Sequence, residues 1–322
     1  MPLCESNKNG KKKKLIFITG PTAVGKTKIS VKVAGRIGGE ILSMDSMQIY
    51  RGMDVGTAKV REEEMEKIPH HLLDLVSPGE RFTAHDYQTI AYETIDQIDS
   101  RGHKPIFVGG TGLYLDAILH DFHFAHINIE PELRKRLGEA YDRDQGQALF
   151  HFLKKVDPES ARILHQTNRK RILRAMEVYL STGKSLSDWK KEEKKEERYE
   201  ALIFVLTDDR EKLYERINQR VIQMMEEGLV EENRRLLEEG MPFDAQAALA
   251  IGYRQVQWYE KGLVTYEEMV RLIQQYSRNY AKRQVSWFHR YPEAIFFNRS
   301  EKSEEQIVEE MEEQINRFYN ER

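Results

Sequence analysis

One short segment constrains this chain more than any other: a glycine-rich loop that directly follows a short apolar run. The run, residues 15–18 (LIFI), is rich in β-branched and aromatic side chains and predicts a buried strand. The loop, residues 20–27 (GPTAVGKT), fits the pattern G-x-x-x-x-G-K-[ST], which binds phosphate groups. Apolar side chains at helical spacing then predict a helix over residues 27–36. A helix that begins directly after such a loop offers its N-terminus to an anion.

The residue types in this loop suit phosphate binding. Glycines let the backbone amides turn inward, Lys26 supplies a positive charge, and the Thr27 hydroxyl can bind Mg²⁺. A phosphate loop does not by itself name a reaction. Kinases, NTPases and transferases with a diphosphate leaving group can all use one.

Strands and helices alternate over the first third of the chain. Residues 40–44 predict a second strand, residues 84–100 an amphipathic helix, and residues 105–108 a third strand. This alternation predicts a parallel sheet, in which ligands bind beyond the carboxyl ends of the strands. Asp45 and Gly109 stand at two of those ends.

The alternation stops in the middle of the chain. From about 120 to 199 the pattern is helical and polar, residues 201–206 restore a buried strand, and from 209 onward the chain is almost wholly helical in pattern. We therefore expect a P-loop NTPase or kinase-like parallel α/β core, residues 14–119 and 200–322. An all-α insertion domain is expected over residues 120–199.

Composition limits the class of protein. With 322 residues, 40% hydrophobic and 32% charged, the chain has the composition of a globular protein of about two domains. It contains no apolar run of the roughly 18–20 residues that a membrane span needs, and its start lacks a secretory signal. The single cysteine excludes an internal disulfide framework. We expect a cytoplasmic, monomeric protein without a membrane partner.

Asp45 has three interpretations from spacing alone. A carboxylate at a strand end beside a phosphate site can hold Mg²⁺, or it can act as a general base on the incoming nucleophile. It can also simply cap a turn or a helix. The spacing does not distinguish among the three.

Several motifs follow one another in an order that is typical of one family. They are GPTAVGKT at 20–27, DSMQ at 45–48, YRGMDVGTAK at 50–59, VGGTGLY at 108–114, RILRAME at 171–177, RINQR at 216–220, IGYR at 251–254 and YAKRQVSW at 280–287. In this order, from about 14 to 290, the chain resembles the bacterial type of the tRNA dimethylallyltransferases, also called tRNA isopentenyltransferases.

The resemblance implies prenyl transfer. The donor would be dimethylallyl diphosphate, and the acceptor the exocyclic amine of the adenosine at position 37 in tRNA, with release of diphosphate. It implies Mg²⁺ as the cofactor, bound at Thr27, and the tRNA anticodon stem-loop as the partner, contacted in part by the insertion domain. An adenine amine is a poor nucleophile, so the resemblance favours Asp45 as the general base.

The resemblance also assigns site residues. The expected catalytic residues are Asp45, Lys26, Thr27, Thr111 and Arg220. The residues expected to bind the diphosphate are Gly20, Pro21, Thr22, Ala23, Val24, Gly25, Lys26, Thr27, Arg216 and Arg220. Arg216 and Arg220 are four residues apart in a helical pattern and share a face, although ordinary pairing with neighbouring acids is the alternative.

The expected tRNA contacts are more widely spread. They are Asp45, Ser46, Met47, Gln48, Thr111, Arg134, Lys170, Arg171, Arg174, Gly252, Tyr253, Arg254, Lys282 and Arg283. Residues 271–291 contain five Lys or Arg, no acid and several aromatic side chains, a composition that suits RNA phosphates and unstacked bases. An amphipathic core helix is the alternative for this segment. The target base must leave the stack to react, and Gln48 suits reading its edge.

Three other functions remain open. An adenylate isopentenyltransferase has a similar phosphate loop and aspartate but uses a free nucleotide, so the insertion and the basic segment 271–291 count against it. A P-loop small-molecule kinase would bind ATP instead. A non-catalytic RNA-binding protein is disfavoured by the intact Gly25, Lys26, Thr27 and Asp45.

Overall fold

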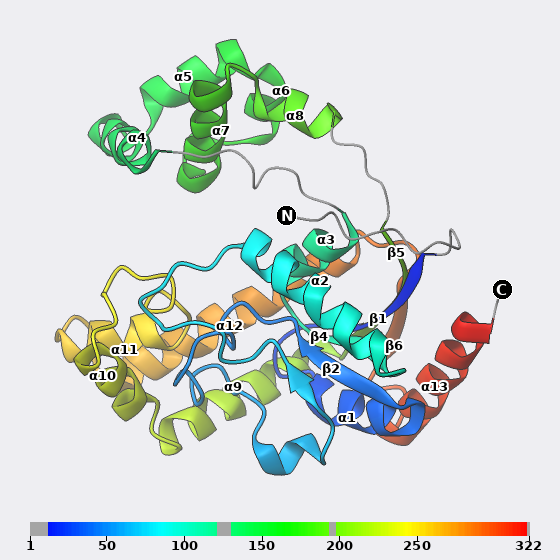
Figure 1. The fold of residues 1–322 in the computed structure, drawn as a ribbon. Coiled ribbons are helices and arrows are strands. Elements are labelled where there is room, and N and C mark those ends of the chain that lie inside the picture. Colours follow the sequence, from blue (N-terminus) through cyan, green and yellow to red (C-terminus); the bar gives the residue numbers. More distant parts are fainter. Residues whose placement is uncertain (1–11, 121–129, 193–197, 321–322) are drawn as a thin grey trace. The chain divides into compact units, whose positions relative to one another are not determined.

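The computed structural model describes residues 12–120, 130–192 and 198–320. The chain divides into two compact units (Figure 1). The first, here called the core unit, comprises Met1–Leu119 and Arg198–Arg322, and the second, the insertion unit, comprises His120–Glu197. Within the ranges described, no helix is both long and apolar enough to cross a membrane.

Parallel strands form one sheet in the core unit, in the order β3-β2-β4-β1-β5-β6. Their bounds are β1 (Lys13–Thr19), β2 (Gly39–Ser43), β3 (His70–His71), β4 (Lys104–Gly109), β5 (Tyr199–Thr207) and β6 (Ile295–Asn298). Every neighbouring pair runs parallel. The predicted P-loop type of parallel α/β core is confirmed, and β1, β2, β4 and β5 lie where the sequence patterns indicated.

The sequence patterns missed two strands. β3 has only two residues, and β6 lies in the segment expected to be almost wholly helical, so that expectation is wrong at residues 295–298. A strand of four residues carries too few alternations to stand out as a period of two. Its single fully buried side chain is Phe297, because β6 is an edge strand that pairs only with β5.

The sheet is covered on both faces, as its apolar strands require. On one face Leu15 and Phe17 pack with α2 (Ala84–Ser100), α3 (Gly112–Leu119) and α12 (Tyr266–Phe288). On the other, Ile16 and Ile18 pack with α1 (Lys26–Ile37) and α13 (Glu304–Asn320) (Figure 1). Successive residues of a strand point to opposite faces, so β1 serves both cores.

Of the remaining elements of the core unit, the first two contribute residues to a cavity beyond the carboxyl ends of the strands. The remaining elements are η1 (Glu62–Met65), α9 (Arg210–Glu226), α10 (Leu229–Glu238) and α11 (Tyr253–Glu260). α9 and α12 pack against each other. Thr265 begins α12, because its hydroxyl accepts the amide of Glu268 while the Glu268 carboxylate accepts the amide of Thr265.

The insertion unit is helical throughout its described residues. Its helices are α4 (Pro131–Asp144), α5 (Gln147–Val156), α6 (Pro158–Ile163), α7 (Arg169–Thr182) and α8 (Leu186–Glu192). It has a small apolar core of its own that includes Leu137, Leu153 and Ile172. An independent core is what a separately folding unit requires.

Candidate active site

A cavity of about 460 Å³ lies beyond the carboxyl ends of β1, β2 and β4. The phosphate loop forms one wall, the segments that follow β2 and β4 form a second, and α9 and α12 contribute a third. Among the residues that line it are Thr22, Lys26, Thr27, Asp45, Gln48, Ala58, Gly110, Arg216, Arg220, Tyr280 and Gln284. The position agrees with the general rule for ligands of parallel sheets.

The phosphate loop turns sharply into α1. Gly25 has a positive φ of 87°, a backbone conformation that favours glycine, and it directly precedes the first helical residue, Lys26. The Lys26 ammonium donates to the carbonyl oxygens of Gly20 and Pro21, at 3.0 and 2.8 Å. Burial lowers the pKa of Lys26 to about 7; the charge of Arg220 acts in the same direction, and Asp45 opposes both.

Two arginines hold the backbone of the phosphate loop. Arg216 Nε donates to the carbonyl of Ala23 at 3.2 Å, and Arg299 Nη1 donates to that of Val24 at 2.8 Å. Arg216 also pairs with Asp208, whose side chain is 1% exposed. Arg299 was not among the residues expected at the site, because it follows the missed strand β6 and belongs to none of the motifs.

Arg220 also lines the cavity, where its guanidinium lies near two other segments of the lining. Its Nη1 atom lies 3.5 Å from the Thr22 hydroxyl oxygen, and its Nη2 atom lies 3.4 Å from the carbonyl oxygen of Ala58. Burial lowers the pKa of Arg220 from its ordinary value, and the negative charge of Asp45 partly offsets this. A half-buried guanidinium in this position suits an anionic ligand on the phosphate loop.

Of the three roles that its spacing left open, the structure shows Asp45 in the turn cap and places its carboxylate where the other two would require it. Its Oδ1 atom accepts the backbone amide of Met47 at 2.9 Å, which is a turn cap. The same carboxylate lines the cavity together with Lys26 and Arg220. The pKa of Tyr280 is raised by burial first and by the charge of Asp45 second, so the phenol stays protonated beside that carboxylate.

Thr111 ties the end of β4 to the end of β2. Its hydroxyl accepts the amide of Ser46 at 3.1 Å, and its own amide donates to the carbonyl of Met44 at 3.2 Å. Thr111, Ser46 and Met47 are not among the residues that line the cavity, whereas Gly109 and Gly110 are. In this structure the contacts of Thr111 therefore orient the segment that carries Asp45.

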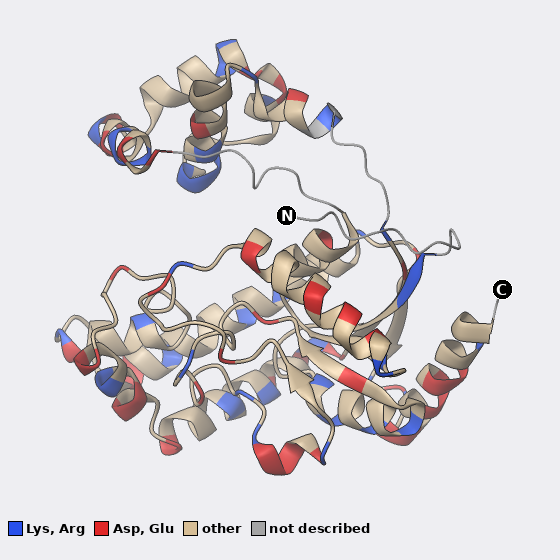
Figure 2. Cartoon of the chain, viewed as in Figure 1, with Lys and Arg blue, Asp and Glu red and all other residues tan. Residues whose placement is uncertain are grey.

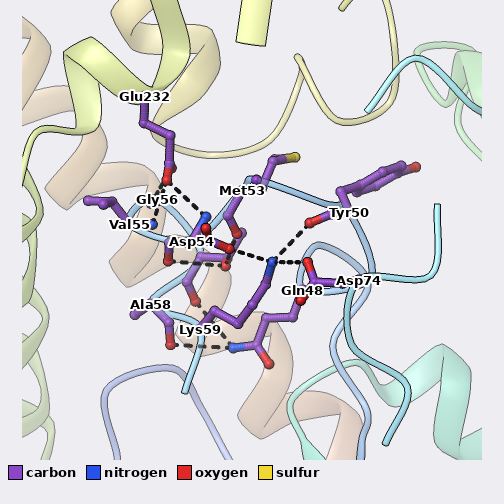
Figure 3. Close-up of polar contacts among 12 residues, drawn as sticks. Gln48, Tyr50, Met53, Asp54, Val55, Gly56, Ala58, Lys59, Asp74 and Glu232 are labelled. Carbon is purple, nitrogen blue, oxygen red and sulfur yellow. Dashed lines mark hydrogen bonds and ion pairs between the residues drawn. The ribbon is translucent and has the colours of Figure 1, made fainter. Parts of the chain in front are cut away.

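The carboxamide of Gln48 has hydrogen-bond partners on both sides, and Figure 3 shows those of its nitrogen. Its Oε1 atom accepts the Ser43 hydroxyl at 3.0 Å. Its Nε2 atom donates to the carbonyl oxygens of Thr57 and Ala58 at 3.3 and 3.4 Å. Gln48 therefore faces the cavity in a defined orientation.

Gln284 is a site residue that was not among those expected from the sequence. Its Oε1 atom accepts the amide of Thr22 at 2.9 Å, and its Nε2 atom donates to the carbonyl of Gly110 at 3.0 Å. Tyr280, one helical turn earlier, lines the same cavity. Both belong to the motif at 280–287, and their spacing of four residues on a helix was the available signal.

Other expected tRNA contacts are not among the residues that line the cavity. In the insertion unit Arg134 pairs with the buried Glu177 at 2.6 Å, and Arg174 lies 3.7 Å from the same carboxylate. Lys170 and Arg171 are exposed at the start of α7. Of these four cations, Arg134 and Arg174 are therefore near a carboxylate, whereas Lys170 and Arg171 are exposed.

In the core unit, Lys282 and Arg283 are exposed on α12. Figure 2 shows basic residues along α9 and α12. Gly252 precedes α11 with a φ of 99°, and Tyr253 is fully buried. The Arg254 guanidinium lies 5.3 Å from the ring centre of Trp258 and 5.1 Å from that of Tyr276.

The donor set around the phosphate loop fits Mg²⁺. No cluster of three or more His, Cys, Asp or Glu side chains suited to a metal occurs among the residues that the structure describes. Mg²⁺ needs no such cluster, because it usually keeps several waters and takes one or two protein oxygens plus substrate phosphates. Thr27 and Asp45 offer a hydroxyl and a carboxylate in the same cavity.

Comparison with known proteins identifies the family. The family model described as IPP transferase matches residues 48–291. The tRNA dimethylallyltransferase of Anoxybacillus flavithermus is 46% identical over 275 residues, which cover 85% of this chain and 87% of that relative. The chain belongs to the IPP transferase family. A second member, the tRNA dimethylallyltransferase of Bacillus subtilis, is 43% identical over 90% of this chain and 92% of its own.

Solved structures agree with membership of the IPP transferase family. The tRNA isopentenylpyrophosphate transferase of Bacillus halodurans superposes with a TM-score of 0.72 at 40% identity, covering 95% of this chain and 96% of that one. A eukaryotic dimethylallyltransferase acting on tRNA gives a TM-score of 0.76 at 28% identity, over 89% of this chain and 74% of its own.

Proposed function

We propose that this chain is a tRNA dimethylallyltransferase. One observation carries the proposal. A single cavity is lined both by Lys26 of the phosphate loop and by Asp45, which lies just after β2. A diphosphate leaving group and a proton acceptor are the two requirements for alkylating an amine with an allylic diphosphate. The curated relatives that carry this enzyme name support the choice of reaction.

The donor we propose is dimethylallyl diphosphate, bound with its diphosphate on the phosphate loop. Backbone amides of the loop, Lys26 and Arg220 would stabilise the negative charge that develops on the leaving oxygen. We propose Thr27 as the protein ligand of Mg²⁺, which when bound supplies further positive charge at the diphosphate. Arg216 would act by holding the loop backbone rather than by contacting the donor.

The acceptor we propose is the exocyclic amine of an adenosine in the anticodon loop of tRNA. The amine nitrogen forms a bond to the allylic carbon while the bond from that carbon to the diphosphate oxygen breaks. The electron pair of the broken bond leaves with the diphosphate. Asp45 accepts the proton that the amine loses, so the adenine product is neutral. Thr111 would position the segment that carries Asp45.

Recognition of tRNA is proposed to use both units. Lys170 and Arg171 in the insertion unit and Lys282 and Arg283 on α12 are exposed cations suited to phosphates. Arg134 and Arg174 would contribute indirectly, since both are committed to Glu177. For Gln48 to read the adenine edge, its carboxamide must exchange one of its present partners. The monomeric state and the cytoplasmic location remain our predictions from the sequence.

The test is transfer of radiolabelled dimethylallyl diphosphate, with Mg²⁺, to unmodified tRNA and separately to AMP. Label in tRNA alone is the expected result. A matched tRNA with guanosine in place of the target adenosine is the control and should take no label. Label in AMP would instead identify an adenylate isopentenyltransferase. With no transfer to either acceptor and tight ATP binding, the kinase alternative would replace the proposal.

A further inference from the structure

A buried carboxylate outside the cavity binds three successive backbone amides. Glu232 on α10 is 7% exposed. Its Oε2 atom accepts the amides of Asp54 and Val55, both at 2.9 Å, and its Oε1 atom accepts the amide of Gly56 at 3.0 Å (Figure 3). Glu232 does not line the cavity. These hydrogen bonds join segments that are 176–178 residues apart in the chain.

Successive amides that converge on one point form an anion-binding concavity. Here the anion is supplied by the chain itself. The Tyr253 hydroxyl donates to Glu232 Oε1 at 2.6 Å and orients the carboxylate. Gly56 packs so closely on the ring of Tyr253 that a β-carbon at this position would lie 2.5 Å from two ring atoms. The loop is thus held between a carboxylate and an aromatic ring.

The residues that follow these amides form part of the cavity. The carbonyl of Thr57 accepts from Gln48 Nε2 at 3.3 Å. The carbonyl of Ala58 accepts from Gln48 Nε2 at 3.4 Å and from Arg220 Nη2 at 3.4 Å. Thr57 and Ala58 line the cavity beside both side chains. The position of this loop therefore sets the orientation of Gln48 and Arg220.

Lys59, the residue that follows Ala58, forms a second anchor of the loop. Its ammonium donates to the carbonyl of Tyr50 at 2.9 Å and lies 2.6 Å from carboxylate oxygens of both Asp54 and Asp74 (Figure 3). Asp54 contacts both anchors, because its amide donates to Glu232 and its carboxylate accepts from Lys59 (Figure 3). Only the Glu232 anchor belongs to a helix distant in the chain.

We propose that Glu232 is a positioning residue for prenyl transfer, acting through residues 54–58 on Gln48 and Arg220. The inference rests on the proposed function and extends it beyond the cavity. A displacement of about 1 Å in a positioning group can reduce a rate about a hundredfold. We therefore expect Glu232→Gln to lower the rate of transfer and to leave tRNA affinity nearly unchanged.

The experiment is single-turnover transfer from dimethylallyl diphosphate to saturating tRNA. Glutamine keeps the size of the side chain but replaces one acceptor oxygen with an amino group, which cannot accept a backbone amide. The rate constant is expected to fall about 10- to 100-fold, while the dissociation constant for tRNA changes less than about threefold. An unchanged rate constant would overturn the inference.

A matched control separates positioning from general loss of a buried carboxylate. Asp157 in the insertion unit is 1% exposed and accepts the amides of Ser160 and Ser187 at 3.0 and 3.2 Å. Asp157→Asn should lower the unfolding temperature but keep the single-turnover rate at saturating tRNA. An equal loss of rate in both variants would make the effect of Glu232 structural only.

A double-mutant cycle tests the route through Gln48. In a Gln48→Ala background the rate loss caused by Glu232→Gln should shrink at least about threefold, because one of the two positioned groups is already absent. Losses that simply multiply would contradict the coupling. If Glu232→Gln does not fold, Tyr253→Phe removes one of the bonds to the carboxylate, and an unchanged rate in that variant overturns the inference. Absence of transfer by the wild type would count against the proposed function instead.

Discussion

The side chain of Gln284 is joined to the backbone of Thr22 by a hydrogen bond of 2.9 Å between Oε1 and the amide nitrogen. The other end of the same carboxamide donates to the carbonyl of Gly110 at 3.0 Å. One side chain of α12 thus connects the phosphate loop with the loop that follows β4. This connection joins two motifs that are separate in the sequence.

Replacing Gln284 with Ala should impair both loops. The change removes the partner of a loop amide and of a buried carbonyl, and each unsatisfied buried group costs about 1–3 kcal/mol. We expect a higher KM for dimethylallyl diphosphate and a lower unfolding temperature. Gln284→Glu is the informative companion, because it keeps an acceptor for Thr22 but brings a negative charge towards the diphosphate. Unaltered KM values in both variants would show that the bridge is not needed for donor binding.

Diphosphate binding should take up a proton at Lys26. With a pKa of about 7 in the free protein, Lys26 is largely neutral at pH 8, and a bound anion favours its charged form. Affinity should therefore weaken as the pH rises above 7. Calorimetric titration with inorganic diphosphate, in two buffers of different ionisation enthalpy, measures the uptake. Lys26→Arg should abolish the proton uptake that is due to Lys26, since a guanidinium stays protonated. Equal proton uptake in that variant would refute the assignment of the uptake to Lys26.

Replacing Arg216 with Ala and replacing Arg220 with Ala should affect different properties of the protein. Arg216→Ala leaves the buried Asp208 without its ion-pair partner, and we expect a loss of about 3 kcal/mol in unfolding free energy. Arg220→Ala removes a guanidinium from the cavity, so the main effect should be weaker donor binding and slower transfer. Urea unfolding and steady-state kinetics on both variants compare the two. Identical profiles would mean that the distinction drawn from their contacts is wrong.

Asp45→Ala should slow the chemical step and spare tRNA binding. General base catalysis contributes about 10²- to 10⁴-fold, so a loss in this range is expected in single-turnover transfer. The Met47 amide loses its cap as well, and Asp45→Asn, which keeps an acceptor oxygen for it, serves as the control. A large loss of tRNA affinity would make Asp45 a residue that positions the substrate.

Lys282→Ala combined with Arg283→Ala should weaken tRNA binding. The decrease should be largest at low salt, and the slope of log affinity against log salt should flatten by about two, one for each phosphate that the variant no longer neutralises. Lys302→Ala with Arg317→Ala removes the same charge from cations that are paired with Glu310 and Glu313. If both double variants bind tRNA like the wild type, α12 does not belong to the interface.

The sequence predicted the phosphate loop and four of the strands correctly, because the signals for these elements are local. A short run of apolar residues at 15–18 and glycines at fixed spacing report on neighbouring residues only. Asp45 was likewise found at a strand end. The sequence did not predict β6, because Ile295–Asn298 is too short for its alternation to be distinguished from a helical pattern.

The side chains that hold the site in place could not be predicted from local sequence patterns. Gln284 lies 262 residues from Thr22 along the chain, and Glu232 lies 176 residues from Gly56. A glutamine or glutamate on an amphipathic helix has the same local pattern whether it faces solvent or a distant loop. The same ambiguity affects Arg134, which was expected to contact tRNA. Its ion pair with Glu177 exists only in the folded insertion unit.

The sequence by itself determined the parallel α/β core, the phosphate loop and the carboxylate at the next strand end, because each depends on residues within a few positions of one another. Only the tertiary structure decided which polar side chains hold these groups in place. Gln284, Arg299 and Glu232 acquire their roles from the packing of α12, the segment after β6, and α10 around the carboxyl ends of the strands. Hydrogen bonds between such distant segments exist only once the sheet has brought them together.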